Sequence, residues 1–171
     1  SGTEVSPWLT IQKAANAAVG GNTVCVKAGT YTEHIIFPNS GSSGNYITFQ
    51  KYSSDVVTIK PPVNTYLGWN QVSPNHHSGN FEMTGKAYIK IKGFKFVGNG
   101  SGAVPDAVIS VEQGANNIII DGNSMDDIWT SAVIAGYFKP SGQSYAAWDI
   151  IFTNNYVRRP NGDWVELMSY D

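Results

Sequence analysis

The sequence has little charge, a single cysteine and no long apolar run. Charged residues make up 14% of its 171 residues, whereas about a quarter is typical of soluble proteins. Cys25 is the single cysteine, which excludes an internal disulfide. No apolar run approaches the roughly 18 residues of a membrane-spanning helix. A formal net charge of −2 gives no basic excess for nucleic acid, so we expect neither a membrane span nor a nucleic-acid partner.

Most polar positions are occupied by glycine, asparagine, serine and threonine rather than by charged residues. Glycine and asparagine adopt the left-handed backbone conformation of tight turns at low cost, so this composition favours an all-β protein with many turns. Cys25 lies in an alternating segment, Thr23–Val26, that is typical of a strand. We expect its thiol to be buried and inert.

One helix is predicted, from about Pro7 to Val19. Ser6 is the expected N-cap, and proline suits the first helical position. Trp8 and Ile11 lie on the apolar face of this helix. We expect that apolar face to cover the first of the strands that follow the helix.

Beyond the helix, apolar and polar residues alternate in short segments, which predicts strands. Clusters of glycine, asparagine, proline or serine separate these segments. The predicted strands are Thr23–Lys27, His34–Phe37, Tyr46–Lys51, Val56–Lys60, Phe81–Met83, Tyr88–Lys92, Ala107–Glu112, Asn117–Asp121, Ala132–Ala135, Asp149–Thr153 and Trp164–Met168.

Three nine-residue segments repeat one pattern. Each has two apolar residues in alternation, then a residue suited to a left-handed turn, and another apolar residue three positions later. The segments start 29 and 32 residues apart. They are 88–96, 117–125 and 149–157, and their turn residues are Gly93, Gly122 and Asn154.

A repeat of this length with one recurring corner indicates a solenoid whose coils stack strand on strand. We predict one domain over residues 1–171, a right-handed parallel β-helix of about five coils that the helix caps; a β-sandwich is the alternative. Asn123 and Asn155 occupy the same corner of successive repeats, so their side chains are expected to lie one above the other and to bond the turn backbone. Residues 164–168 are predicted to open another coil, which leaves the C-terminal end uncapped or incomplete.

Five segments resemble the coils of bacterial pectate-lyase-like β-helix proteins. They are Pro7–Ala15, Val24–Glu33, Tyr46–Phe49, Asp126–Trp129 and Asp163–Leu167. This family includes secreted lyases that act on pectin, alginate and related acidic polysaccharides. The resemblance therefore implies a secreted or cell-surface bacterial protein whose partner is an acidic polysaccharide.

Such lyases abstract the proton next to a uronic-acid carboxylate, while a cation, often calcium, neutralises that carboxylate. On this basis we assign Arg158 and Glu166 as catalytic residues and Glu112 and Asp163 as calcium ligands. The competing interpretation is that Glu82, Glu112 and Glu166 are solvated surface acids, and that turn formation explains Asp163.

Substrate contacts are assigned to cationic and aromatic side chains. Arg159 suits bidentate binding of carboxylates. Lys90, Lys92 and Lys95 form a basic stripe on one coil that would meet an acidic chain, with Lys90 and Lys92 as its substrate contacts, although solvent-facing lysines on strands also serve solubility. Trp69 and Trp164 are expected to stack on sugar rings.

Two functions are therefore open from the sequence. One is an extracellular polysaccharide-binding protein that cleaves its substrate by β-elimination. The other is a non-catalytic surface or filament-forming module that self-assembles, because an open coil offers unpaired strand edges to a second chain. Loss of activity in Arg158 or Glu166 variants would favour the first, and concentration-dependent association would favour the second.

Overall fold

The computed structural model describes residues 2–62, 79–98, 107–128, 131–136, 147–158 and 165–168. Within these ranges the chain forms one short helix and fifteen strands. The strands make three five-stranded sheets, and the strand pairings within them are parallel. The predicted all-β class is confirmed, and the antiparallel pairing that a β-sandwich would require is not found in these sheets.

Each sheet collects every third strand of the chain. The first sheet contains β1 (Thr23–Val26), β4 (Ile47–Lys51), β7 (Ala87–Lys92), β10 (Asn116–Asp121) and β13 (Trp148–Thr153). The second contains β2 (Gly29–Thr32), β5 (Val57–Lys60), β8 (Lys95–Val97), β11 (Ser124–Asp126) and β14 (Tyr156–Arg158). The third contains β3 (Ile35–Ile36), β6 (Gly79–Glu82), β9 (Ala107–Glu112), β12 (Ser131–Gly136) and β15 (Val165–Met168).

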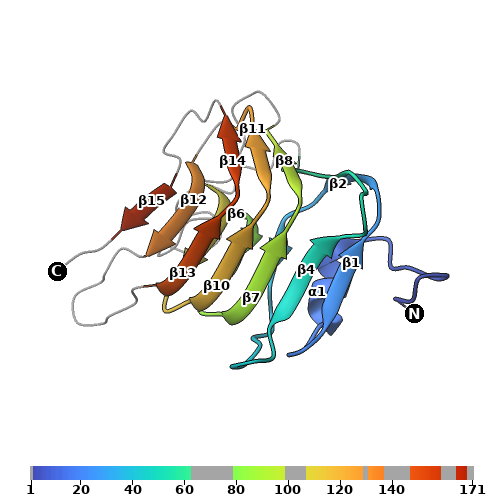
Figure 1. The fold of residues 1–171 in the computed structure, drawn as a ribbon, viewed down its shortest axis with the longest axis horizontal. Helices are drawn as coiled ribbons and strands as arrows, with labels where there is room; N and C mark the ends of the chain where they lie inside the picture. The colour runs from blue at the N-terminus through green and yellow to red at the C-terminus, as the bar shows by residue number, and fades with distance from the viewer. Residues whose placement is uncertain are drawn as a thin grey trace.

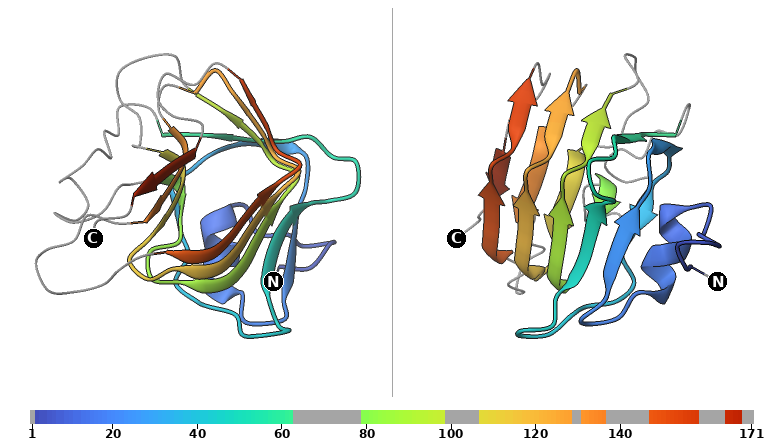
Figure 2. Two further views of the ribbon diagram at one scale, coloured as in Figure 1. Left: turned by 60° about the vertical axis from the view of Figure 1, so that its left-hand side comes forward. Right: turned by 45° about the vertical axis from the view of Figure 1, so that its right-hand side comes forward.

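Three consecutive strands therefore form one layer, and five layers stack along the molecule (Figure 1). The first layer is β1 to β3, and the fifth is β13 to β15. Seen along the stack, the three sheets enclose one central space with a roughly triangular outline (Figure 2). A residue in one layer thus lies directly above its register partner in the next.

The core consists of rows of apolar side chains that run through the layers. In the first sheet, Ile47, Ile89 and Ile118 are register partners and are all buried. Phenylalanines fill the wider parts of the core: the ring centroids of Phe81 and Phe96 lie 5.2 Å apart in an edge-to-face contact. Such contacts contribute about 0.5–1.5 kcal/mol beyond the area they bury.

The helix α1 (Ile11–Ala17) is shorter than predicted and begins later. Thr10, not Ser6, is its N-cap, and its hydroxyl accepts a hydrogen bond from the Lys13 N–H at 3.2 Å. The Glu33 carboxylate accepts the N–H groups of Ile11 and Gln12, each at 3.0 Å. A carboxylate that follows β2 therefore fixes the start of the helix, and no local sequence signal around Pro7 reveals this.

The position predicted for the helix is confirmed. Ile11, Ala14 and Ala15 are buried, and α1 lies beside the first layer at the N-terminal end of the stack (Figure 2). Trp8 precedes the helix but still packs against the core. The helix thus covers apolar side chains that the first layer would otherwise leave in water.

The predicted asparagine ladder is also confirmed. The Asn123 amide donates to the Ile91 carbonyl and to Asn155 Oδ1, each at 3.0 Å, and its oxygen accepts the Phe94 N–H at 3.0 Å. The Asn155 amide in turn donates to the Ile120 carbonyl at 2.7 Å. These two side chains bond backbone groups of the third and fourth layers and thereby link three successive layers.

The left-handed corners occur where the repeat predicts them, with φ of +75° at Gly93, +65° at Gly122 and +53° at Asn154. A second left-handed corner, which the sequence did not reveal, opens each repeat. Its residues are Tyr88, Asn117 and Asp149, with φ of +57°, +53° and +54°. A tyrosine rarely adopts this conformation, so stacking on the neighbouring layers must impose it.

Two predictions about strands and burial are wrong. The strands that the sequence missed, β2, β8, β11 and β14, all belong to the second sheet. The last three have only three residues each, too few to establish a period of two. Cys25 is exposed rather than buried, because β1 directs Val24 and Val26 inward and Cys25 outward.

Replacing Asn123 tests the ladder. Asn123→Ala leaves the buried Phe94 N–H and Ile91 carbonyl without their partner, so we expect the free energy of unfolding to fall by about 2–4 kcal/mol. Urea denaturation followed by circular dichroism measures this. Asn155→Ala in the more exposed fifth layer is the matched control and should cost about 1 kcal/mol. Equal losses in the two variants would contradict the burial argument.

Candidate functional site

The outer face of the third sheet carries buried polar side chains. Phe81 and Ile109 point into the core, so their neighbours along the strands, Glu82, Ser110 and Asn80, point outward. These outward residues are nevertheless at most 4% exposed, and Glu112 is 0% exposed. The interpretation of Glu82 and Glu112 as solvated surface acids is therefore wrong.

A histidine that the sequence did not single out is paired with one of these acids. His34 Nε2 lies 2.9 Å from Glu82 Oε2, and the His34 side chain is 15% exposed. The Thr84 hydroxyl donates to the other carboxylate oxygen of Glu82 at 3.4 Å. His34 comes just before β3 in the first layer and Glu82 ends β6 in the second, so the layer stacking brings together residues 48 positions apart.

The register of the third sheet arranges its polar residues in rows. Glu82 of β6 is the partner of Ser110 of β9, which is the partner of Ile134 of β12. Glu166 of β15 is in turn the partner of Ile134, so it belongs to the same row. Glu112 lies two residues beyond Ser110 and is the partner of Gly136. The strands that carry Glu82, Glu112 and Glu166 thus belong to one sheet, as the sequence predicted. Two layers separate Glu82 from Glu166.

The His34–Glu82 pair has the geometry of a carboxylate-oriented base. A carboxylate that accepts the Nε2–H of an imidazole holds the ring in one orientation and leaves the lone pair on Nδ1. Within the described ranges, His34 Nδ1 makes no hydrogen bond. A partly exposed imidazole of this kind can take a proton from a bound molecule.

Arg158, predicted to be catalytic, is held by an acid. Its Nε donates to Asp126 Oδ1 at 2.8 Å, and its terminal nitrogen pairs with Asp126 Oδ2 across the second sheet. The hydrogen bond and charge of Asp126 raise the pKa of Arg158 further above its usual value. A general base must lose its proton readily, so this pairing does not favour Arg158 in that role.

Lys90 and Lys92 of the predicted basic stripe lie on β7, on the outer face of the first sheet, whereas Lys95 lies on β8 of the second sheet. Lys92 pairs with Asp121 at 3.2 Å. Lys90 Nζ lies 4.4 Å from the centroid of the Tyr46 ring, a cation–π contact. The three lysines therefore lie on two sheets, neither of which carries the His34–Glu82 pair, and Asp121 neutralises the charge of Lys92.

Four predicted site residues lie outside the described residues, and their roles stay predictions. They are Trp69, Arg159, Asp163 and Trp164. In the part of the chain that the structure describes, no three histidine, cysteine, aspartate or glutamate side chains form a group able to hold a metal ion. The role of Glu112 as a calcium ligand likewise stays a prediction.

A sequence signal for His34 exists in retrospect. It precedes an apolar pair, Ile35–Ile36, in the first layer. Its partner Glu82 is in register with Ile36, two residues after His34. Without a full copy of the repeat in residues 34–82, this alignment could not be made from the sequence.

Comparisons with known proteins identify no family for this chain. No family model matches it, and no solved structure matches it. A stretch of 58 residues, 34% of this chain, is 38% identical to the uncharacterized protein YwoF of Bacillus subtilis (strain 168). That stretch spans 12% of the relative's length. In the described ranges, no helix has the length and apolar character needed to cross a membrane.

The Lys92–Asp121 pair predicts an acid-sensitive contribution to stability. The Asn154 amide, which donates to Asp121 Oδ1 at 2.9 Å, and then Lys92 lower the pKa of Asp121 in the folded protein. Stability from this group is therefore present above the unfolded pKa and is lost as the pH falls through the lower, folded-state pKa. We expect Lys92→Met to raise the pKa of Asp121, as measured by NMR titration of its carboxyl carbon.

Lys95→Met is the matched control for this titration. Lys95 is likewise an exposed lysine. It is a suitable control because the ion pair of Asp121 is formed with Lys92. This variant should leave the Asp121 titration unchanged. An unaltered pKa of Asp121 in Lys92→Met would show that the ion pair has no effect in solution.

Proposed function

We propose that the three stacked sheets form a right-handed parallel β-helix, and that the protein binds an acidic polysaccharide beside the partly exposed His34, next to the third sheet, and cleaves it by β-elimination. The strand order, in which each strand pairs with the one three places later, supports the β-helix. Parallel crossovers are right-handed in about 98% of cases, which supports the handedness. The resemblance of the sequence to pectate-lyase-like proteins supports the substrate class and a location outside a bacterial cell.

The observation that carries the proposed reaction is the His34–Glu82 pair. In the reaction, His34 Nδ1 takes the proton from the ring carbon next to the uronate carboxylate. The electron pair of that C–H bond forms a carbon–carbon double bond, the neighbouring C–O bond of the glycosidic link breaks, and the leaving oxygen takes a proton from water. Glu82 stabilises the imidazolium that forms, in the way a carboxylate orients the base of a hydrolytic triad.

Pectate-lyase-like proteins commonly use calcium to neutralise the substrate carboxylate, but the described residues do not gather the ligands that calcium requires. Glu112 and Asp163 remain the proposed ligands. An assay with and without added calcium therefore belongs in the test, and either result is compatible with His34 as the base.

Activity assays on single variants test the proposal. The purified chain is incubated with pectate, alginate and glycosaminoglycans, and the ultraviolet absorbance of unsaturated products is followed. We expect His34→Gln to lower the rate by about 10²–10⁴-fold, the usual contribution of a general base, and Glu82→Gln to lower it less. Each variant must keep the circular dichroism spectrum of the parent.

Arg158→Gln is the informative control. Arg158 is the other candidate for the base, and it lies in an exposed ion pair with Asp126. Because such a pair contributes at most about 1 kcal/mol to stability, the variant should still fold. We expect it to retain most of the activity. A loss of activity in Arg158→Gln with none in His34→Gln would overturn our choice of base, and no product from any substrate would overturn the lyase function.

A second candidate function, self-assembly, is supported by the fifth layer. Ile150 and Phe152 are only partly buried, whereas their register partners Ile118 and Ile120 in the fourth layer are 0% exposed. Large apolar side chains that are exposed also gather in this layer; they are Trp148, Ile151, Tyr156 and Val165. An apolar end of this kind is typical of a surface that another polypeptide covers.

Sedimentation equilibrium tests this second candidate. If copies stack through the fifth layer, the apparent molecular mass of the parent protein rises with its concentration. Phe152→Glu should keep the apparent mass at that of the monomer. Val56→Glu, which changes an exposed apolar residue of the second layer, should have no effect. A parent chain that stays monomeric at the highest attainable concentration would contradict self-assembly.

A further inference from the structure

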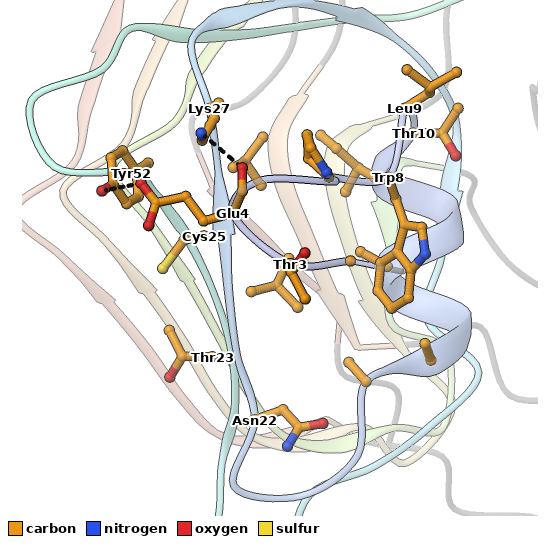
Figure 3. A pocket seen from close by; sticks show the side chains of 18 of the residues that line it. Thr3, Glu4, Trp8, Leu9, Thr10, Asn22, Thr23, Cys25, Lys27 and Tyr52 are labelled. Carbon is orange, nitrogen blue, oxygen red and sulfur yellow. Dashed lines mark hydrogen bonds between the residues drawn. The ribbon is translucent and has the colours of Figure 1, made fainter.

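A cavity of about 650 Å³ lies at the N-terminal end of the stack, beside β1 (Figure 3). β1 runs along one side, Trp8 and α1 lie along the other, and Thr3 and Glu4 cross between them. The lining is largely apolar, with a few polar groups near β1. Its volume falls within the roughly 300–1,000 Å³ of ligand-binding pockets.

The strand beside this cavity has one free edge. β1 is the end strand of the first sheet and pairs with β4 alone. The carbonyls of Asn22 and Val26 accept the N–H groups of Thr48 and Tyr52 at 2.9 and 2.7 Å. In a parallel ladder, alternate residues direct their backbone groups to opposite edges. The N–H and C=O groups of Thr23 and Cys25 therefore point away from β4, toward the cavity.

Nothing in the described part of the chain pairs with these backbone groups. The segment that crosses the cavity makes its own turn, in which the Gly2 N–H donates to the Ser6 carbonyl and the Ser6 N–H donates to the Thr3 carbonyl. It is tied down through Glu4, whose carbonyl accepts from Lys27 Nζ at 3.2 Å and whose carboxylate accepts from the Tyr52 hydroxyl at 2.9 Å. Side chains thus hold this segment over the cavity, and the edge of β1 beneath it keeps its hydrogen-bonding capacity.

We propose that this cavity binds a short extended peptide, which adds a sixth strand to the first sheet along the free edge of β1. An added strand lies about 4.8 Å from its neighbour, on the side of β1 where the cavity is found. Main-chain hydrogen bonds to Thr23 and Cys25 would supply affinity, and the apolar wall at Trp8 and Ile11 would accept an apolar side chain of the peptide. Strand addition at a sheet edge is an established mode of peptide recognition.

The test uses the full chain and a peptide with the sequence of Tyr46–Lys51, acetylated at one end and amidated at the other. This sequence is chosen because it contains β4, the strand that pairs with the opposite edge of β1. Amide hydrogen exchange is followed by NMR with and without saturating peptide. We expect exchange at the Thr23 and Cys25 amides to slow at least about tenfold, as for amides that gain a hydrogen bond. Val24 and Val26, already bonded to β4, should change little. No slowing, or equal slowing along all of β1, would overturn the proposal.

Two N-methylated peptides provide the matched control. One carries methyl groups on the amides of alternate residues, and the other carries them on the remaining residues, so each loses the donors of one edge only. We expect one peptide to lose binding and the other to keep it, because an added strand uses a single edge. Equal affinities of the two would contradict strand addition and point to binding through side chains.

A protein variant tests the same bond from the other side. Cys25→Pro removes an N–H that points to the cavity and leaves the bonds between β1 and β4 in place, since proline is tolerated at sheet edges. We expect it to weaken peptide binding about 5- to 10-fold, whereas Cys25→Ala should bind like the parent. Equal binding by the two variants would contradict the proposal. If Cys25→Pro fails to fold, the N-methylated peptides still decide the question.

Discussion

The structure depends on parallel pairing in register between each strand and the one three places later. This pairing sets every side chain on top of its equivalent in the next layer, so a row that faces the core must be apolar or must satisfy its polar members by hydrogen bonds. Ile47, Ile89 and Ile118 form a row of the first kind. Asn123 and Asn155 form a row of the second kind, in which each amide bonds the backbone of a neighbouring layer.

The same register produces the candidate site. On the outer face of the third sheet it brings His34 of the first layer against Glu82 of the second and places Ser110 of the third beside them. A carboxylate that is almost fully removed from water costs several kcal/mol unless it is paired and hydrogen-bonded. His34 and Thr84 supply such contacts to Glu82. The polar face of this sheet is therefore a specific arrangement of groups, whereas Lys92 and Arg158 on the other two sheets form exposed ion pairs.

The sequence predicted those features that depend on local repetition. The segments 88–96, 117–125 and 149–157 predicted three core rows, the corners at Gly93, Gly122 and Asn154, and the asparagine ladder. It did not predict features that depend on contacts between layers. Glu33 sets the start of α1 from 21 residues away, and the burial of Glu82 and Glu112 depends on what covers the sheet, which alternation along a strand does not encode. Three strands of the second sheet, β8, β11 and β14, are too short for a period to be detected.

The protonation state of His34 tests the central claim most directly, because the proposed reaction needs the lone pair on Nδ1 and the proton on Nε2 beside Glu82. Two-dimensional NMR of the ¹⁵N-labelled imidazole distinguishes the two neutral tautomers. We predict that His34 is the Nε2–H tautomer in the parent chain and that Glu82→Gln shifts it toward a mixture of the two tautomers. A neutral His34 with its proton on Nδ1 in the parent chain would contradict the account, since its lone pair would then face Glu82 instead of a substrate.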